Sequence, residues 1–453
     1  MEKVILLINI LSFILVLILI VRSWKKGNIL GFIYLVVYNY LIVGQAINIS
    51  INLSEHFSVY YLYHHITREG HAIASILLFV ITLFLFFGDL FIKYSNVQKK
   101  IQKETDREPL FILNLKMSIF YYMTIFSIQV LIFSLIVKQS GGLDIIFNSS
   151  RVYVSGITFY IVLLSFSCYP IFIKILYKLK INIIDIILYG FSIIMIMLFS
   201  RFIAIYQLFI LILLFIYGSR NPKLIINKYK KRIVLLFSLA VVIFMVYGSY
   251  KHAINFTNSG SLTDVYNYYK YNDSAIFLDI DTNYKIGIES MSSFSGLFSD
   301  LVDKNKYFIP FDFGVTLIIS VMKVIPSYIR TPIQPLIDYV SSDIYYNKSI
   351  IISPLTEIFG YFSYLGFIIY PLMILLIYRR LHFKIINSYN SYKILTYIII
   401  GVYGISLIRG PFVNFFTYSI GQIVVAYLSI YIFRIIYLLK KYDSLCVLEK
   451  VER

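Results

Sequence analysis

The chain has few charged residues, few cysteines and few helix breakers for its length. Only 14% of the 453 residues are charged, and there are 2 cysteines, 1 tryptophan and 10 prolines. Cys168 falls in an apolar run and Cys446 in a basic tail, so the two cannot form a disulfide framework. The chain has no GxxxxGK[ST] phosphate loop, no GxSxG elbow and no HExxH zinc motif. These absences argue against nucleotide hydrolases, serine hydrolases of the usual elbow type and zinc proteases.

Apolar residues are abundant instead, at 59% of the chain, against about 45–50% in soluble domains. A bilayer core of about 30 Å needs about 20 helical residues. Runs of this kind predict membrane spans near 3–22, 29–51, 70–92, 115–137, 156–177, 233–250, 361–378, 394–410 and 414–434. The lipid bilayer is therefore the solvent expected for most of the chain.

The apolar stretch 183–217 is too long for one membrane crossing and short for two. The distribution of positive charge over the loops distinguishes between these two possibilities. A break at Ser200 and Arg201 makes it a hairpin, and 26 Lys and Arg residues then fall in loops on one side of the membrane. Positive charge is retained in the cytoplasm, so we expect a multi-pass membrane protein with an outer N-terminus and a cytoplasmic C-terminus.

The sequence thus predicts an all-α polytopic integral membrane protein with about 11 transmembrane helices (10–12) and one large outer loop. We expect a single membrane domain over 1–453, with N-terminal spans in 1–250, the periplasmic or extracellular loop in 251–360 and C-terminal spans in 361–439. Within the loop, 313–324 is an apolar run too short to span and predicts an interfacial or re-entrant helix.

The net charge of +18 does not indicate nucleic acid as a partner. Its positive residues are distributed over the cytoplasmic loops, where they face anionic lipid headgroups. Membrane lipid is the partner that this pattern predicts.

Arginines on the outer side are unexpected, because membrane insertion retains Lys and Arg on the cytoplasmic side. An arginine placed there therefore indicates a structural or functional role. A guanidinium can bind a phosphate through two parallel hydrogen bonds, as a lipid-linked pyrophosphate at headgroup level would require. Snorkelling or ion pairs with loop carboxylates are the alternative roles. The candidate pyrophosphate- or glycan-binding residues are Arg151, Arg201, Arg330 and Arg409.

His252 and Glu357 are the candidate catalytic acid or base residues, and Glu289 and Asp312 are further outward-facing acids. Glu357 precedes a span, where capping a helix N-terminus is its alternative role. The histidine-rich stretch follows no zinc spacing, so we expect a solvated loop and no metal or other cofactor; it comprises His56, His64, His65, Glu69 and His71.

Several short stretches, in this order along the chain, resemble the bacterial oligosaccharide repeat unit polymerases, the Wzy-type O-antigen and capsule polymerases. They are GGLDIIFNSSR at 141–151, the SR at 200–201, VIPSYIRTPIQP at 324–335, SPLTEIFGYFSYLGFIIYP at 353–371 and RGPF at 409–412. The large loop before the last spans adds to the resemblance.

The resemblance implies a glycosyltransferase that needs neither metal nor nucleotide and works at the outer face of the cytoplasmic membrane. It would polymerise undecaprenyl-pyrophosphate-linked repeat units into O-antigen or capsular polysaccharide, with a chain-length regulator as a further partner. Two alternatives stay open: an O-antigen ligase or other lipid-linked-sugar glycosyltransferase, and a flippase for lipid-linked oligosaccharides. The flippase is less favoured because no internal repeat is found and the outer loop is long.

Overall fold

The computed structural model describes residues 2–55, 58–61, 64–91, 119–143, 157–177, 179–218, 293–299, 354–388, 390–409 and 412–451, with scattered positions between 146 and 302. In this part the protein is mostly helical. Seven of the described helices are long and apolar enough to cross a membrane, and three shorter apolar helices accompany them. The prediction of a helical membrane protein is confirmed at this level. The total of about eleven spans and the large outer loop stay predictions, because the expected span 233–250 and most of 251–353 lie outside the described residues.

The first half of the chain contains α1 (Glu2–Lys26), α2 (Ile29–Tyr38), the π-helical η1 (Asn39–Val43), α3 (Gly44–Glu55), β1 (Ser58–Tyr61), β2 (His64–Thr67), α4 (Arg68–Phe91), α5 (Ile119–Ser140), α7 (Ile157–Leu164), the 3₁₀-helical η4 (Ser165–Cys168), α8 (Tyr169–Leu176), α9 (Ile183–Phe199) and α10 (Arg201–Tyr217). The last part contains α16 (Pro354–Phe362), the 3₁₀-helical η6 (Ser363–Leu365), α17 (Gly366–Leu375), the π-helical η7 (Leu376–Arg380), α18 (Leu381–Asn387), α19 (Ser391–Tyr403), α20 (Ser406–Arg409) and α21 (Phe412–Val451).

The chain forms two compact units. One comprises 1–98, 280–386 and 400–419, and the other comprises 99–279, 387–399 and 420–453. We describe each unit by itself, and the expected single membrane domain stays a prediction.

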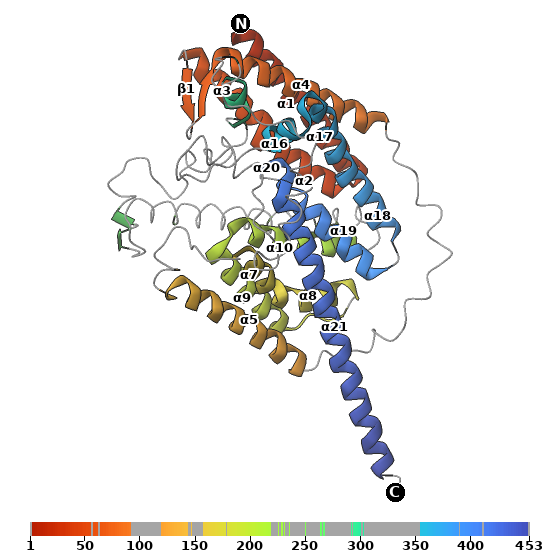
Figure 1. Ribbon diagram of the computed structural model, residues 1–453. Coiled ribbons are helices and arrows are strands. Elements are labelled where there is room, and N and C mark those ends of the chain that lie inside the picture. The colour runs from red at the N-terminus through yellow and green to blue at the C-terminus, as the bar shows by residue number, and fades with distance from the viewer. Residues whose placement is uncertain are drawn as a thin grey trace. The chain divides into compact units, whose positions relative to one another are not determined.

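In the first unit, α1 packs along α4 and also contacts α2 and α3, and α17 packs on α4 as well (Figure 1). Gly27 has a φ of 73° and ends α1: its N–H donates to Trp24 O, and the N–H of Asn28 donates to Ser23 O. This is the Schellman arrangement, which glycine adopts without strain. The side chain of Asn28 then caps α2, so two spans reverse direction within a few residues.

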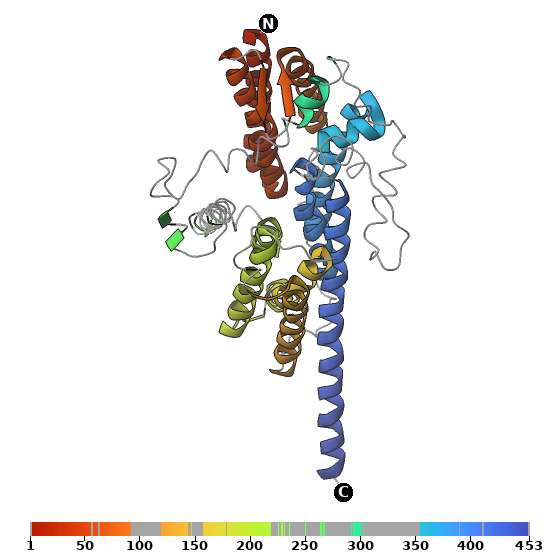
Figure 2. The same ribbon diagram turned by 60° about the vertical axis from the view of Figure 1, so that its left-hand side comes forward.

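Beside these helices, β1 and β2 pair antiparallel, with Ser58 opposite Thr67. The short helical stretch 293–299 lies against the end of this hairpin and the start of α4 (Figure 2). Gly70 permits the approach, because a Cβ there would lie 2.3 Å from the backbone nitrogen of Ser299. Part of the segment predicted as an outer loop therefore packs directly on a span.

In the second unit, α5 packs against α7 and η4, and α9 packs against η4 and α10. Ser200 is extended, with φ −150° and ψ 105°, between α9 and α10. The predicted break of the stretch 183–217 at Ser200 and Arg201 is thus confirmed in the backbone.

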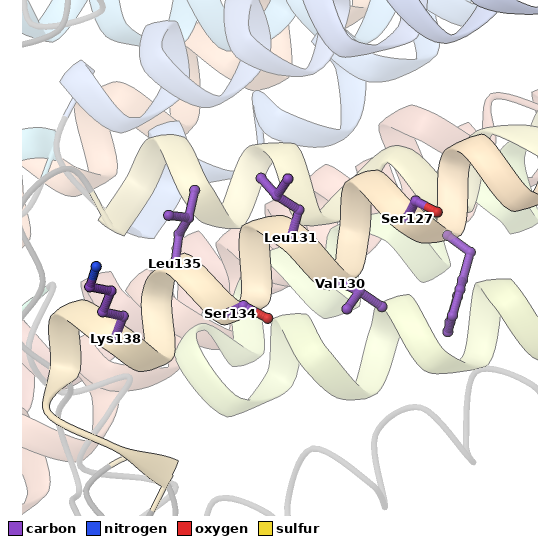
Figure 3. A pocket seen from close by; sticks show the side chains of 7 residues that line it. Ser127, Val130, Leu131, Ser134, Leu135 and Lys138 are labelled. Carbon is purple, nitrogen blue, oxygen red and sulfur yellow. The ribbon is translucent and has the colours of Figure 1, made fainter.

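A shallow groove of about 520 Å³ runs along α5 in this unit (Figure 3). All its lining residues come from α5, and they are mostly apolar: Phe126, Ser127, Val130, Leu131, Ser134, Leu135 and Lys138. An apolar face of this kind on a spanning helix contacts lipid chains.

Candidate functional site

Glu357 is one of the two predicted catalytic residues, and it lies in the first turn of α16 with only 1% of its surface exposed. Pro354 starts the helix, a position where its missing N–H costs nothing. Leu355 and Ile358 on either side are fully buried, which anchors the helix. A carboxylate that is buried in this way requires polar or charged partners. The position of Glu357 near the N-terminus of α16 is favourable, because the helix dipole stabilises a negative charge there.

A sharp turn separates α16 from the following span. Ser363 has a φ of 50°, unusual for a residue with a side chain, and it redirects the chain between the two helices. Gly366 then passes close to Ile358, since a Cβ there would lie 2.6 Å from the carbonyl oxygen of Ile358. This contact fixes α16 against the start of α17.

α16 also packs against α20, the short helix that ends at Arg409. Tyr370 joins the same region, because its hydroxyl donates to Leu407 O at 3.1 Å. The backbone therefore brings together two stretches that the sequence analysis singled out, the one around Glu357 and the one that opens with Arg409. The side chain of Arg409 lies outside the described part of the structure.

Serines from 293–299 connect α16 with α4 through side-chain contacts. Ser293 Oγ lies 3.3 Å from Thr356 Oγ1, beside Glu357. Ser295 Oγ lies 2.9 Å from His71 Nδ1, and His71 Nε2 lies 2.9 Å from Ser50 Oγ. One polar set thus links α3, α4, the stretch 293–299 and α16 at a single end of the first unit.

Aromatic rings hold the stretch 293–299 on the same helices. Phe294 meets Phe367 with ring centroids 6.0 Å apart, and Phe298 meets Phe359 at 5.4 Å. Phe359 stacks on Phe367 at 5.5 Å. These contacts provide an apolar wall beside the serine contacts.

His71 is only 1% exposed, so the prediction that it belongs to a solvated loop is wrong. The reason is visible in the spacing of α4, where four buried polar residues recur on one face: His71, Ser75, Thr82 and Asp89. Intervals of four and seven residues place them on the same side of a helix. This polar stripe could have been found in the sequence, whereas its partners Ser50 and Ser295 could not.

The structure describes only some of the other residues that were predicted to form the site. Arg201 begins α10, in the second unit, but its side chain is outside the described residues. His252, Arg151, Arg330, Glu289 and Asp312 all lie in stretches that the structure does not describe. Glu69 is exposed at the start of α4.

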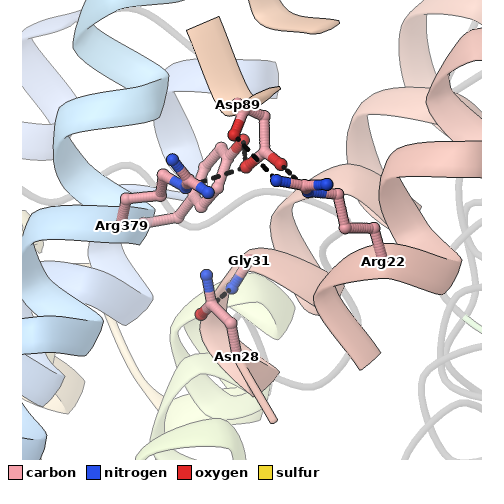
Figure 4. Close-up of polar contacts among 6 residues, drawn as sticks. Arg22, Asn28, Gly31, Asp89 and Arg379 are labelled. Carbon is pink, nitrogen blue, oxygen red and sulfur yellow. Dashed lines mark hydrogen bonds and ion pairs between the residues drawn. The ribbon is translucent and has the colours of Figure 1, made fainter. Parts of the chain in front are cut away.

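Figure 4 shows a second charged cluster, which the sequence analysis missed. It lies at the end of α4 opposite to His71. The fully buried Asp89 meets Arg22 Nε at 2.9 Å through Oδ2 and Arg379 Nε at 2.9 Å through Oδ1. The Tyr378 hydroxyl donates to Asp89 Oδ1 at 3.3 Å. This cluster joins α1, α4 and η7.

The second unit has its own buried ion pair. Lys174 Nζ lies 2.7 Å from Asp185 Oδ2, and the Tyr122 hydroxyl donates to Asp185 Oδ1 at 2.7 Å. Asp185 Oδ2 also accepts from the N–H of Asn182, at 2.6 Å, within a capping box at the start of α9. The pair therefore connects α8 with α9.

Of these clusters, the one around Glu357 offers the chemistry of a general base: a carboxylate shielded from water beside a helix that ends in an arginine.

Comparisons of the chain with models of protein families, with curated proteins and with solved structures gave no match, so no known family is shown for it.

Proposed function

We propose that this protein polymerises lipid-linked oligosaccharide repeat units by glycosyl transfer at the outer face of the bacterial cytoplasmic membrane. The observation that carries the proposal is the packing of α16, with its buried Glu357, against α20, which ends at Arg409. The two stretches come from distant parts of the polymerase resemblance. Their proximity supports one site that combines a base with a cation.

The reaction that fits this pair transfers a growing glycan from undecaprenyl pyrophosphate to a sugar hydroxyl of the next lipid-linked unit. The hydroxyl oxygen attacks the anomeric carbon and its proton passes to the Glu357 carboxylate, while the bond from the anomeric carbon to the pyrophosphate oxygen breaks. The leaving undecaprenyl pyrophosphate keeps the bonding electrons. The arginines predicted from the sequence, Arg409 first and also Arg201, Arg151 and Arg330, would offset its charge.

His252 is the second candidate base, and it would act on the same hydroxyl. The proposal requires no nucleotide, because both sugar substrates arrive on lipid carriers. The orientation with an outer N-terminus and a cytoplasmic C-terminus belongs to the proposal, as it puts the Glu357 end outside. A chain-length regulator is the protein partner that it implies.

Deletion of the gene in its own host, followed by complementation with this chain, tests the proposal. Surface polysaccharide on a gel should collapse from a ladder to a single repeat unit and recover on complementation. Accumulation of finished polymer on the membrane lipid would indicate a ligase instead. Accumulation of single lipid-linked units, with no surface glycan, would indicate a flippase, and an unchanged ladder would exclude all three functions.

A further inference from the structure

α5 is buried on one face and exposed on the other. On the buried face, Gln129 Nε2 donates to Leu164 O at 3.4 Å, and Ile125 and Ile136 are fully buried. The exposed face carries the groove of Figure 3, whose lining residues form two rows with intervals of four along the helix. The large apolar side chains in these rows are 40–60% exposed: Phe126, Val130, Leu131 and Leu135. The helix is therefore held by one face, and its groove is open to the bilayer.

The groove contains two serines, Ser127 and Ser134, whose hydroxyls make no hydrogen bond within the part of the chain that the structure describes. Thr124, on the same helix, instead donates to Phe120 O at 2.8 Å. A hydroxyl that faces hydrocarbon without a partner costs free energy. Ser134 lies four residues from the polar end of the groove, so an acceptor from the headgroup region of a lipid can reach it.

Lys138 provides a positive charge at that end of the groove (Figure 3). It lies in the last turn of α5, its side chain is exposed, and among the described residues it forms no ion pair. Ser134 is one turn away, about 6 Å along the helix axis. The headgroup region of one leaflet is about 5–7 Å thick, because a bilayer of about 40–45 Å has a hydrocarbon core of about 30 Å. A phosphate beside Lys138 therefore puts the ester carbonyls of a glycerolipid at the depth of Ser134.

We propose that the groove on α5 binds one anionic glycerophospholipid. Lys138 attracts its phosphate, Ser134 donates a hydrogen bond to an ester carbonyl, and an acyl chain runs along Val130 and Leu131 to Ser127. Ser134 and Ser127 are about 10 Å apart along the axis, within the half-thickness of about 15 Å that an acyl chain occupies. The site lies wholly in the second unit and does not depend on the proposed polymerase reaction.

The test uses the purified full-length chain in a mild detergent, with three lipids as probes: phosphatidylglycerol, phosphatidylcholine and undecaprenyl phosphate. Native mass spectrometry counts the lipid molecules that each protein molecule retains during a titration. We expect the wild type to retain phosphatidylglycerol at concentrations where phosphatidylcholine is lost, because only the former carries a net negative charge. Equal retention of these two lipids would overturn the proposal.

Two substitutions remove the polar contacts singly. Lys138→Gln removes the charge and should weaken the retention of phosphatidylglycerol about fivefold. Ser134→Ala should weaken it by a similar factor, because the ester carbonyl loses its donor. The matched control is Lys180→Gln, which changes an exposed lysine of the same unit and should stay within about twofold of the wild type. Equal losses in Lys138→Gln and Lys180→Gln, or none in Ser134→Ala, would contradict the proposed site.

Ser127→Leu fills the apolar end of the groove and leaves Lys138 and Ser134 in place. We expect it to weaken retention about fivefold or more, because the acyl chain loses part of its contact with α5. The matched control is Gly190→Leu, which adds an apolar side chain on α9 where a Cβ has nothing within 4 Å. Retention at the wild-type level in Ser127→Leu would show that no chain lies in the groove, against the proposal.

Two other occupants of the groove give different results. An isoprenoid phosphate has no ester carbonyl, so undecaprenyl phosphate retained more tightly than phosphatidylglycerol, and equally by Ser134→Ala, would indicate a groove for a carrier lipid. A dimer that Ser127→Leu dissociates would indicate a second copy of the chain on this face. Either result would overturn the proposal.

Discussion

Lys174 Nζ and Asp185 Oδ2 lie 2.7 Å apart with side chains only 4% and 0% exposed. Tyr122 covers the pair, with its hydroxyl on the carboxylate and its ring 5.4 Å from the ammonium group. Each charge is therefore balanced inside the second unit, and neither can be removed alone without leaving the other buried.

We expect Lys174→Met to destabilise the protein by about 3–5 kcal/mol, because an uncompensated carboxylate stays buried. The double variant Lys174→Met, Asp185→Asn should regain part of this loss. Thermal unfolding of the purified protein measures both, with the exposed Lys180→Met as the control. If Asp185→Asn lowers the stability of the Lys174→Met variant by as much as it lowers that of the wild type, the expected coupling is contradicted.

Gly70 and Gly190 offer a matched pair of glycines in long helices. A Cβ at Gly70 would lie 2.2 Å from Ser299 Oγ and 2.4 Å from its Cα, whereas a Cβ at Gly190 has nothing within 4 Å. Gly70→Ala should therefore displace the stretch 293–299 and lower stability by about 1–3 kcal/mol. Gly190→Ala should be neutral or stabilise by up to about 1 kcal/mol. Equal unfolding temperatures for the two variants would show that the stretch is not packed on α4 in this way.

His71 connects Ser50 and Ser295, so replacing it by leucine leaves a buried hydroxyl without its partner. We expect His71→Leu to lower the free energy of unfolding by about 1–3 kcal/mol. In a Ser295→Ala background the same substitution should have a smaller effect, because the contact is already lost. Additive losses in this double-mutant cycle would show that the two residues do not interact.

Glu357→Gln keeps the shape of the side chain and removes its capacity to accept a proton. In the complementation assay we expect the polysaccharide ladder to shorten strongly at normal protein abundance in the membrane. Glu69→Gln, which changes an exposed acid at the start of α4, is the control and should leave the ladder unchanged.

The double variant Arg201→Ala, Arg409→Ala should also shorten the polysaccharide ladder, because the cations proposed to bind the pyrophosphate are lost. Wild-type chain length in the double variant would remove the arginines from the proposed site.

The predicted orientation can be tested with single cysteines in a chain lacking Cys168 and Cys446. A membrane-impermeant thiol reagent added outside intact cells should modify Lys138→Cys and leave Lys26→Cys unmodified until the cells are opened. Both positions are exposed at helix ends. Labelling in the reverse pattern would place Glu357 on the cytoplasmic side and contradict the proposed reaction.

The sequence by itself determined the helical membrane class, the approximate spans and the break at Ser200, because these depend on local hydropathy and on extended backbone between two apolar helices. The spans predicted near 29–51 and 70–92 are matched by Ile29–Leu53 and Arg68–Phe91. Glu357 could be selected because an acid next to a span is conspicuous. Only the tertiary structure decided that α16 packs on α20, that Ser295 reaches His71, and that Arg22 and Arg379 share Asp89. His71 and Ser295 are 224 positions apart, and the other contacts likewise join residues that are distant in the chain. Hydropathy and charge patterns carry no information on which distant helix faces meet.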